Sequence, residues 1–171
     1  IDMNTGTGWP FGGPEVSIED AASKAIFQTY DIEGGQEIVQ DINVTDKKQQ
    51  PYSVLSRVMA YDENGRCINL TSHVRKDKLE WKAPAGKWKV IALYNSKTRQ
   101  KVKRAAPGGE GYVMNHLSKT AVKNYLSRFD RAFKSSKTSY PHTFFNDSYE
   151  VYQADWTEDF LDQFARRRGY K

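Results

Sequence analysis

The chain has 171 residues, of which 38% are apolar and 13% aromatic, so it can bury a packed core and is not a disordered segment. Its net charge of +5 comes from scattered basic residues, and no nucleic-acid recognition motif accompanies them. One cysteine and three widely separated histidines exclude an internal disulfide and do not have the ligand spacing of a zinc site. The sequence also has no apolar run long enough to span a membrane.

The N-terminal segment is rich in glycine and proline. Positions 4–14 hold four glycines and two prolines around Trp9, a composition that excludes regular helix or strand. This segment is either a tight connection with an aromatic plug or a loop that presents Trp9 to a ligand. Ser17 followed three residues later by Asp20 is typical of a helix cap, which predicts a short helix ending near position 25.

The middle of the chain has the pattern of a β-rich module. From position 26 the apolar residues alternate with period two, and the short runs are separated by turn sequences as far as position 106. This pattern predicts an antiparallel sheet or a small sandwich over 26–106. Trp81 and Trp88 flank one turn, which favours packing between strands over a sugar-binding platform. Cys67 lies in an alternating run, and we expect it to be a small core residue.

The pattern changes again over 107–171. A short strand at 112–114 precedes a helix that Ser118 caps and whose apolar residues keep helical spacing. A second strand, at 142–145, leads to a final helix that we expect Thr157 to cap. This strand–helix–strand–helix order predicts a parallel α/β layer, into which the β-rich module is inserted.

Two carboxylates, Asp147 and Glu150, follow the second of these strands, which ends near Phe145. In barrels of alternating strands and helices, catalytic acids and bases lie at the carboxyl ends of strands. Tyr149 and Trp156 are close in sequence. Aromatic rings offer a sugar a flat apolar face and favour the protonated form of a nearby carboxyl. The spacing alone does not distinguish a sugar-cleaving pair from acids that are solvated or cap the next helix.

Asn115 and His116 follow the strand at 112–114 and would lie at a carboxyl end by the same geometry. They are either sugar-binding groups or ordinary polar groups of a loop. The sequence contains no Ser-His-Asp arrangement that spacing supports, no phosphate loop and no dinucleotide fingerprint. It therefore predicts neither a nucleotide nor a redox cofactor.

Several motifs follow one another along nearly the whole chain. They are the loop Gly6–Pro14, the runs Leu79–Val90 and Ala106–Val113, and Asn146-Asp147-Ser148-Tyr149-Glu150 with Trp156, Thr157, Phe160, Phe164 and Arg167–Tyr170. Together they resemble the motifs of the α-L-rhamnosidases of glycoside hydrolase family 106. The resemblance implies part of a catalytic (β/α)8 barrel over 1–25 and 107–171. A β-rich, sandwich-like insertion over 26–106 would interrupt this barrel.

The resemblance also implies a calcium-assisted, inverting hydrolase that releases terminal L-rhamnose from plant polysaccharides or glycosides. Bacteria typically export such enzymes, so we expect a periplasmic or secreted protein. Glu150 would be the general acid, Asp147 a supporting group and Trp9 a wall of the sugar pocket. Tyr149, Trp156, Asn115 and His116 would complete the substrate-binding set. Asn115 stands where an acid would be expected, which argues against a metal at that position.

Inversion requires a second carboxylate that activates water on the opposite face of the sugar, and this chain offers no convincing candidate. The chain begins at Ile1 rather than Met, and we expect it to be a piece of a longer polypeptide that carries the base. The piece alone would then be inactive. The competing hypothesis is a non-catalytic carbohydrate-binding or structural β module, in which Glu150 is dispensable and sugar affinity depends on Trp81 or Trp88.

Overall fold

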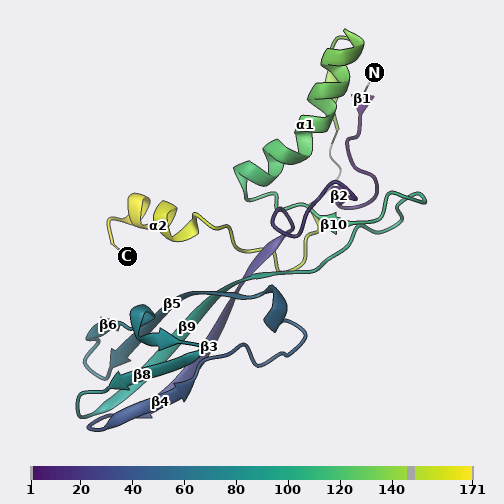
Figure 1. Ribbon diagram of the computed structural model, residues 1–171. Helices are drawn as coiled ribbons and strands as arrows, with labels where there is room; N and C mark the ends of the chain where they lie inside the picture. Colours follow the sequence, from purple (N-terminus) through teal and green to yellow (C-terminus); the bar gives the residue numbers. More distant parts are fainter. Residues whose placement is uncertain (1, 146–148, 171) are drawn as a thin grey trace. The chain divides into compact units, whose positions relative to one another are not determined.

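The computed structural model describes residues 2–145 and 149–170 and divides into two compact units (Figure 1). Residues 25–96 form one, which we call the β unit. Residues 1–24 and 97–171 form the other, which we call the terminal unit.

The β unit contains two sheets. One has the strand order β3-β9-β5-β6, and the other has the order β4-β8-β7. Strands β5 and β8 pair antiparallel with each of their neighbours. The strands are β3 (Ser23–Glu33), β4 (Glu37–Asp41), β5 (Val54–Asp62), β6 (Cys67–Asn69), β7 (Val74–Arg75), β8 (Lys78–Lys82) and β9 (Lys87–Lys97), with short 3-10 helices at Gln50–Tyr52 and Thr71–His73.

One apolar core serves both sheets of the β unit. Alternate residues of each strand point inward, so Leu79 and Trp81 of β8 join Trp88 and Val90 of β9 in the same buried cluster. The rings of Trp81 and Trp88 meet edge to face with centroids 5.2 Å apart. Both indoles are buried, which confirms that they pack in the core. The β-rich, antiparallel character predicted for this region is also confirmed.

The prediction that Cys67 is a core residue is wrong, because its side chain is exposed. In β6 the burial pattern places Ile68 against the core and its two neighbours toward solvent. An alternating run therefore identified the strand, but the choice of inward face depended on the register with β5, where Ala60 pairs with Ile68.

The terminal unit contains two small sheets and both α-helices. Strand β1 (Asp2–Met3) pairs in parallel with β11 (Thr143–Phe144), and β2 (Gly12–Gly13) pairs antiparallel with β10 (Tyr112–Val113). Helix α1 spans Lys119–Ser136, and α2 spans Phe160–Arg168. The order strand, helix, strand, helix after position 107 is thus confirmed. However, β10 and β11 belong to different sheets, and only β11 has a parallel partner among the described residues.

The two helices begin differently. Ser118 is the N-cap of α1, as predicted, and its hydroxyl accepts a hydrogen bond from the Ala121 N–H at 3.3 Å. Thr157 does not cap α2, because Asp159 occupies the N-cap position. The Thr157 hydroxyl instead lies 3.3 Å from the Asp159 carboxylate.

The helix predicted to end near position 25 is absent, and strand β3 begins at Ser23. The local cap contact does form, since the Ser17 hydroxyl accepts from the Asp20 N–H at 3.3 Å. Only a turn follows, because the Ala22 N–H donates to Val113 O, 2.9 Å away. Long-range strand pairing therefore prevails over the local helix signal.

The β unit ends at Ser96, whereas we expected the β-rich module to extend to position 106. Residues 97–106 lie in the terminal unit, where Lys103 pairs with Trp9 through two backbone hydrogen bonds of 2.8 and 2.9 Å. The assignment of the terminal unit to a barrel stays a prediction.

Candidate active site

Glu150 lies in a loop of the terminal unit, and its backbone is fixed by the side chain of Gln100. The Gln100 amide nitrogen donates to Glu150 O at 2.9 Å. The amide oxygen of the same side chain accepts from the Tyr152 N–H at 2.8 Å. Gln100 is itself held by β10, because Val113 N–H donates to its carbonyl at 3.0 Å. One side-chain amide thus fixes the chain on both sides of residue 151.

The carboxylate of Glu150 is exposed. One of its oxygens, Oε2, accepts a hydrogen bond from the Tyr152 hydroxyl at 3.4 Å. Among the residues that the structure describes, no group hydrogen-bonds the other oxygen, Oε1. The Glu150 backbone is therefore held by Gln100 and one carboxylate oxygen contacts one phenol, while the residue as a whole is exposed.

Lys103 connects this loop to Trp9. Its ammonium lies 5.1 Å from the centroid of the Tyr152 ring and 5.9 Å from that of Trp9. Both distances are within the range of cation–π contacts. A series of contacts through Lys103 and Tyr152 therefore links Trp9 to Glu150.

His116 stacks on Tyr149, with ring centroids 5.3 Å apart and planes inclined by 32°. Burial lowers the pKa of His116 below its ordinary value of 6.5, so the imidazole is neutral at pH 7. Its Nδ1 is buried and has no hydrogen-bond partner in the described part of the chain. Tyr149 remains 60% exposed.

Tyr149 also lines an apolar hollow of about 370 Å³ in the terminal unit. Phe144 and Phe145, at the end of β11, contribute exposed rings to the same hollow. Phe11 and Phe129 belong to its wall as well. The hollow could therefore receive an apolar part of a ligand beside the Tyr149 ring.

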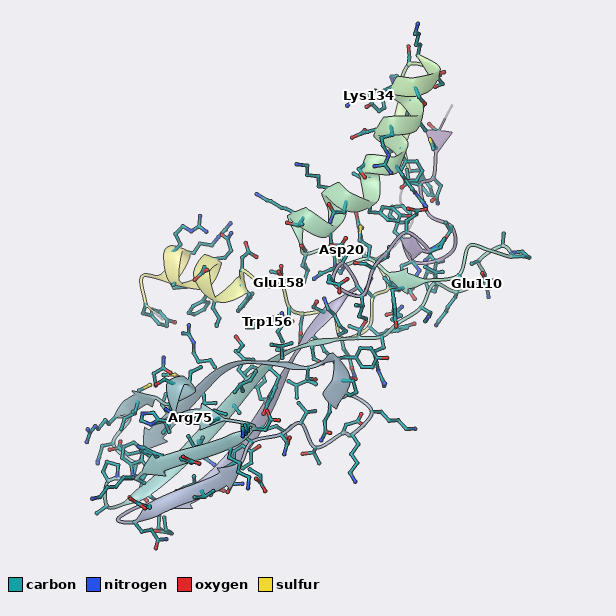
Figure 2. The ribbon with its side chains drawn as sticks, in the orientation of Figure 1. Asp20, Arg75, Glu110, Lys134, Trp156 and Glu158 are labelled. Atoms are coloured by element: carbon teal, nitrogen blue, oxygen red, sulfur yellow. The ribbon has the colours of Figure 1, made fainter. Side chains whose placement is uncertain are left out.

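Asn115 and Trp156 lie in the packed interior of the terminal unit. Asn115 is only 3% exposed; its amide donates to Trp156 O at 3.3 Å, and its amide oxygen accepts from Leu117 N–H at 3.1 Å. The Trp156 ring is buried against Phe160, 4.7 Å between centroids. Figure 2 labels Trp156 in the segment that leads to α2. A sugar could reach either residue only by replacing these contacts, and their role as substrate contacts stays a prediction.

Asp147 lies outside the described residues. Three further residues, Gln100, Lys103 and Tyr152, make contacts at the Glu150 loop but were not among the predicted set. Tyr152 could have been suspected from its position two residues after Glu150. Lys103 stands in a basic run that reads as solvated surface, and no local signal distinguishes Gln100 from other polar residues.

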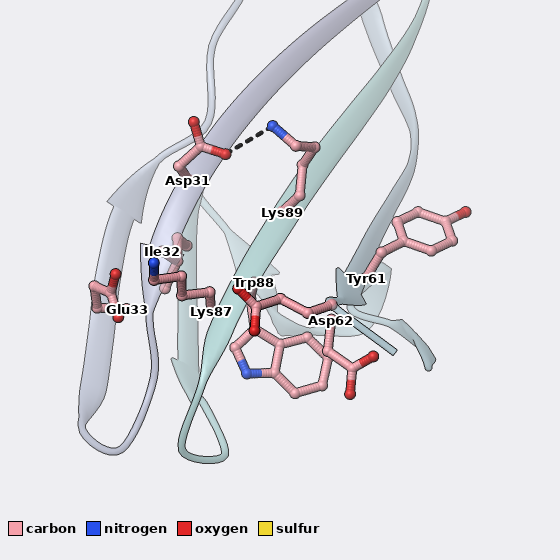
Figure 3. A pocket seen from close by; sticks show the side chains of 9 residues that line it. Asp31, Ile32, Glu33, Tyr61, Asp62, Lys87, Trp88 and Lys89 are labelled. Carbon is pink, nitrogen blue, oxygen red and sulfur yellow. Dashed lines mark hydrogen bonds and ion pairs between the residues drawn. The ribbon is translucent and has the colours of Figure 1, made fainter. Parts of the chain in front are cut away.

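The β unit has a hollow of its own, of about 440 Å³, near Trp88 (Figure 3). Asp31 at its edge forms an ion pair with Lys89, 2.8 Å between the charged atoms. The Trp88 ring is 3% exposed, and its N–H donates to Pro84 O at 2.9 Å. Neither Trp88 nor Trp81 presents a free ring face, which argues against a sugar platform on these residues.

No cluster of three or more His, Cys, Asp or Glu side chains that could hold a metal ion occurs within 2–145 and 149–170. We therefore derive no step of a reaction through a metal. Neither α1 nor α2, nor any other helix in the described ranges, is long and apolar enough to cross a membrane.

Comparison with known proteins defines the class of this chain. The family model of the alpha-L-rhamnosidases of glycoside hydrolase family 106 matches residues 43–171, which is most of the chain. The chain therefore belongs to this family of glycoside hydrolases.

Two individual proteins are similar to it. The "Putative beta-glucuronidase" of Formosa agariphila is 27% identical over 212 aligned positions, which cover 99% of this chain and 18% of that protein. The rhamnosidase of Novosphingobium sp. PP1Y has a similar fold, with a TM-score of 0.64 at 16% identity over 97% of this chain and 32% of the rhamnosidase. The chain thus spans about a fifth of the curated relative and about a third of the solved structure.

Proposed function

We propose that this chain is part of a longer, inverting glycoside hydrolase that releases terminal α-L-rhamnose from plant polysaccharides or glycosides. Glu150 is the general acid in this proposal, and the chain carries only that half of the catalytic pair. Family membership over residues 43–171 supports the reaction class. The structural observation that carries the proposal is the two-point hold of Gln100 on the Glu150 loop, which leaves the carboxyl exposed.

The proposed step uses the free oxygen of Glu150. A protonated Glu150 donates its proton to the glycosidic oxygen as the bond from that oxygen to the anomeric carbon breaks. The Tyr152 hydroxyl holds the second carboxyl oxygen and orients the group. A carboxylate outside this chain, on the opposite face of the sugar, takes a proton from the attacking water. Because that base lies elsewhere, we expect the chain by itself to be inactive.

Trp9 and Tyr149 are the proposed sugar contacts. Trp9 is half-buried with the Lys103 ammonium over its ring, and Tyr149 is exposed and borders the apolar hollow. L-Rhamnose carries a methyl group in place of a hydroxymethyl group, and an apolar hollow suits such a methyl group. Asp147 is proposed as a supporting group on sequence resemblance alone.

A second substrate class has specific support. The curated relative is named as a glucuronidase, and the ammonium of Lys103 lies beside Trp9 and Tyr152, where it could pair with a sugar carboxylate. A β-D-glucuronide is therefore the alternative substrate. A glucuronide carries a negative charge and a rhamnoside does not, so activity measured on both substrates distinguishes the two hypotheses.

The test uses the intact parent protein and aryl glycosides of α-L-rhamnose and β-D-glucuronic acid. We expect cleavage of the rhamnoside, and we expect proton NMR to show that the first-formed sugar has the anomeric configuration opposite to the substrate. Selective cleavage of the glucuronide would replace the proposed substrate by the alternative one. No cleavage of either, together with unchanged binding of plant glycans in a Glu150→Ala variant, would favour a non-catalytic β module.

We also propose that calcium assists the reaction and that the bacterium exports the parent protein. Both proposals rest on the family resemblance. We expect the parent protein to lose activity on chelation and to regain it when calcium, but not magnesium, is restored. Activity that survives chelation would contradict calcium assistance. We expect the parent protein in the periplasm or the medium of its bacterium, which fractionation would test.

A further inference from the structure

A small polar pocket in the β unit shares none of its described lining residues with the candidate active site or with the hollow near Trp88. Its volume is about 150 Å³, enough for about five water molecules or one six-membered ring. Two buried apolar residues, Ile42 and Val44, form part of its wall. The polar lining consists of Asn43, Gln50, Ser53, Asp77 and Tyr94.

Tyr94 is the residue that points to a ligand. Only 5% of it is exposed, and its hydroxyl is buried without a hydrogen-bond partner among the described residues. A buried hydroxyl that makes no hydrogen bond costs free energy, so such groups in proteins usually have a partner that the protein alone does not supply. Burial, with smaller contributions from nearby Tyr30 and Asp77, raises the pKa of Tyr94 far above its ordinary range, so the phenol keeps its proton and can donate it in a hydrogen bond.

The walls of the pocket are fixed in place by other residues. The Tyr30 hydroxyl bonds both the N–H and the carbonyl of Asn43, at 3.2 and 3.3 Å. The Gln50 amide donates to Val44 O at 2.8 Å. On the other side, the Asp77 carbonyl accepts from Ile42 N–H at 2.7 Å. The backbone around the pocket is therefore held in place, while Asn43, Gln50 and Asp77 are exposed to solvent.

Asp77 lies in the tight turn between β7 and β8. Its φ is +61°, and that of the preceding Lys76 is +49°. Asp tolerates this left-handed conformation, as does Asn, which has the same shape without the charge. The turn places one carboxylate at the pocket, and the described lining contains no second acid and no basic side chain.

The chemistry of the lining limits the classes of ligand that this pocket could bind. An anion would be repelled by Asp77, and an apolar ligand would leave the Tyr94 hydroxyl unpaired. Calcium takes six to eight oxygen ligands, commonly from several carboxylates, whereas this lining has one carboxylate. The Gln50 amide and the Ser53 hydroxyl already donate to backbone carbonyls, so the Tyr94 hydroxyl is the buried, unpaired donor of the described lining. One free buried donor together with the Asp77 and amide oxygens suits a neutral molecule with several hydroxyl groups.

We infer that this pocket binds one neutral sugar residue of the glycan on which the parent protein acts, with the Tyr94 hydroxyl donating to a sugar oxygen. This inference rests on the proposed function for the identity of the glycan. The pocket is an accessory contact that raises affinity for a long substrate. It takes no part in bond cleavage.

The first test compares Tyr94→Phe with Tyr61→Phe in the intact parent protein. Both variants lose one phenol hydroxyl in the β unit, but Tyr61 does not line this pocket. Because the Tyr94 hydroxyl has no partner in the described chain, its removal should not lower stability. We expect Tyr94→Phe to raise KM about two- to tenfold for a rhamnose-bearing polysaccharide, with kcat unchanged and an aryl rhamnoside unaffected. The Tyr61→Phe variant should behave as wild type.

The second test is independent of catalysis. Crystals of the parent protein are soaked with methyl α-L-rhamnoside or with sodium glucuronate. We expect the neutral sugar in the pocket, within hydrogen-bond distance of the Tyr94 hydroxyl, and no glucuronate; Asp77→Asn should admit glucuronate. Ordered water alone in the pocket, or equal KM changes for both substrates, would overturn the inference. If the parent cleaves no glycoside, the proposed function fails, while the soak still decides whether this pocket binds a sugar.

Discussion

The tryptophan pair of the β unit and the aromatic rings at the end of β11 in the terminal unit differ in exposure. In the β unit, Trp81 and Trp88 are buried and contact each other in a core shared by two sheets. In the terminal unit, Phe144, Phe145 and Tyr149 are each at least half exposed. These exposed rings lie at the end of β11 and beside the Glu150 loop, which is the region where the candidate active site lies.

This difference indicates which aromatic residues serve stability and which can serve binding. Buried rings in well-packed cores contribute several kcal/mol, whereas an exposed ring contributes little to folding and remains free to contact a ligand. The β unit therefore acts as a self-contained scaffold with one small polar pocket. The terminal unit presents aromatic and carboxyl groups on its surface.

The largest expected effect contrasts Trp88→Ala with Tyr149→Ala in the same chain. Truncating the buried Trp88 side chain to alanine leaves a cavity in the core of the β unit, so this substitution should lower the free energy of unfolding by about 3–5 kcal/mol. Tyr149→Ala removes an exposed ring and should change it by no more than about 0.5 kcal/mol. Urea denaturation followed by circular dichroism measures both. Similar losses for the two variants would contradict the proposed contrast.

The next effect concerns the positioning of Glu150. Replacing Gln100 by Ala removes two hydrogen bonds to the loop, so we expect kcat of the parent protein on a natural rhamnoside to fall about tenfold. Gln28→Ala is the matched control, because it truncates a glutamine of the β unit that does not contact the loop. If both variants retain full kcat, the two hydrogen bonds from Gln100 to the Glu150 loop do not contribute to catalysis.

The smallest effect is a pH dependence in the terminal unit. Burial lowers the pKa of folded His116, so below pH 6.5 the unfolded chain binds more protons than the folded chain. The stability contribution is therefore present above that pH and is lost as the pH falls toward the folded pKa. We expect His116→Gln to flatten the change in melting temperature between about pH 7.5 and about pH 5. His142→Gln controls for the loss of an imidazole, and an unchanged slope in His116→Gln would contradict the account.

Much of the fold could be predicted from the sequence, because short-range patterns determine it. Alternation identified the strands of the β unit, and Ser118 predicted the start of α1. The failures involve long-range partners. Ser17 makes its local cap contact, but the pairing of Ala22 with Val113 directs the chain into a strand. Cys67 was placed on the wrong face because strand register depends on the partner strand.

The candidate site could be predicted only in part for the same reason. The acidic motif and the glycine-rich loop led to Glu150 and Trp9, and family membership is now shown. Gln100 and Lys103 are distant in sequence from Glu150 and carry no motif, so their contact with the loop could be found only in three dimensions. The hydrogen bond from the Asn115 amide to Trp156 O could likewise not be predicted from the sequence.

The most direct measurement compares wild-type parent protein with Glu150→Gln on two α-L-rhamnosides. One substrate has an activated aryl leaving group, and the other is a natural glycoside. A good leaving group needs little protonation, so loss of a general acid should slow the natural substrate by about 100-fold or more and the activated one far less. That result would assign the acid to Glu150. Unchanged rates on both substrates would contradict the assignment and leave Glu150 as a surface residue of the loop.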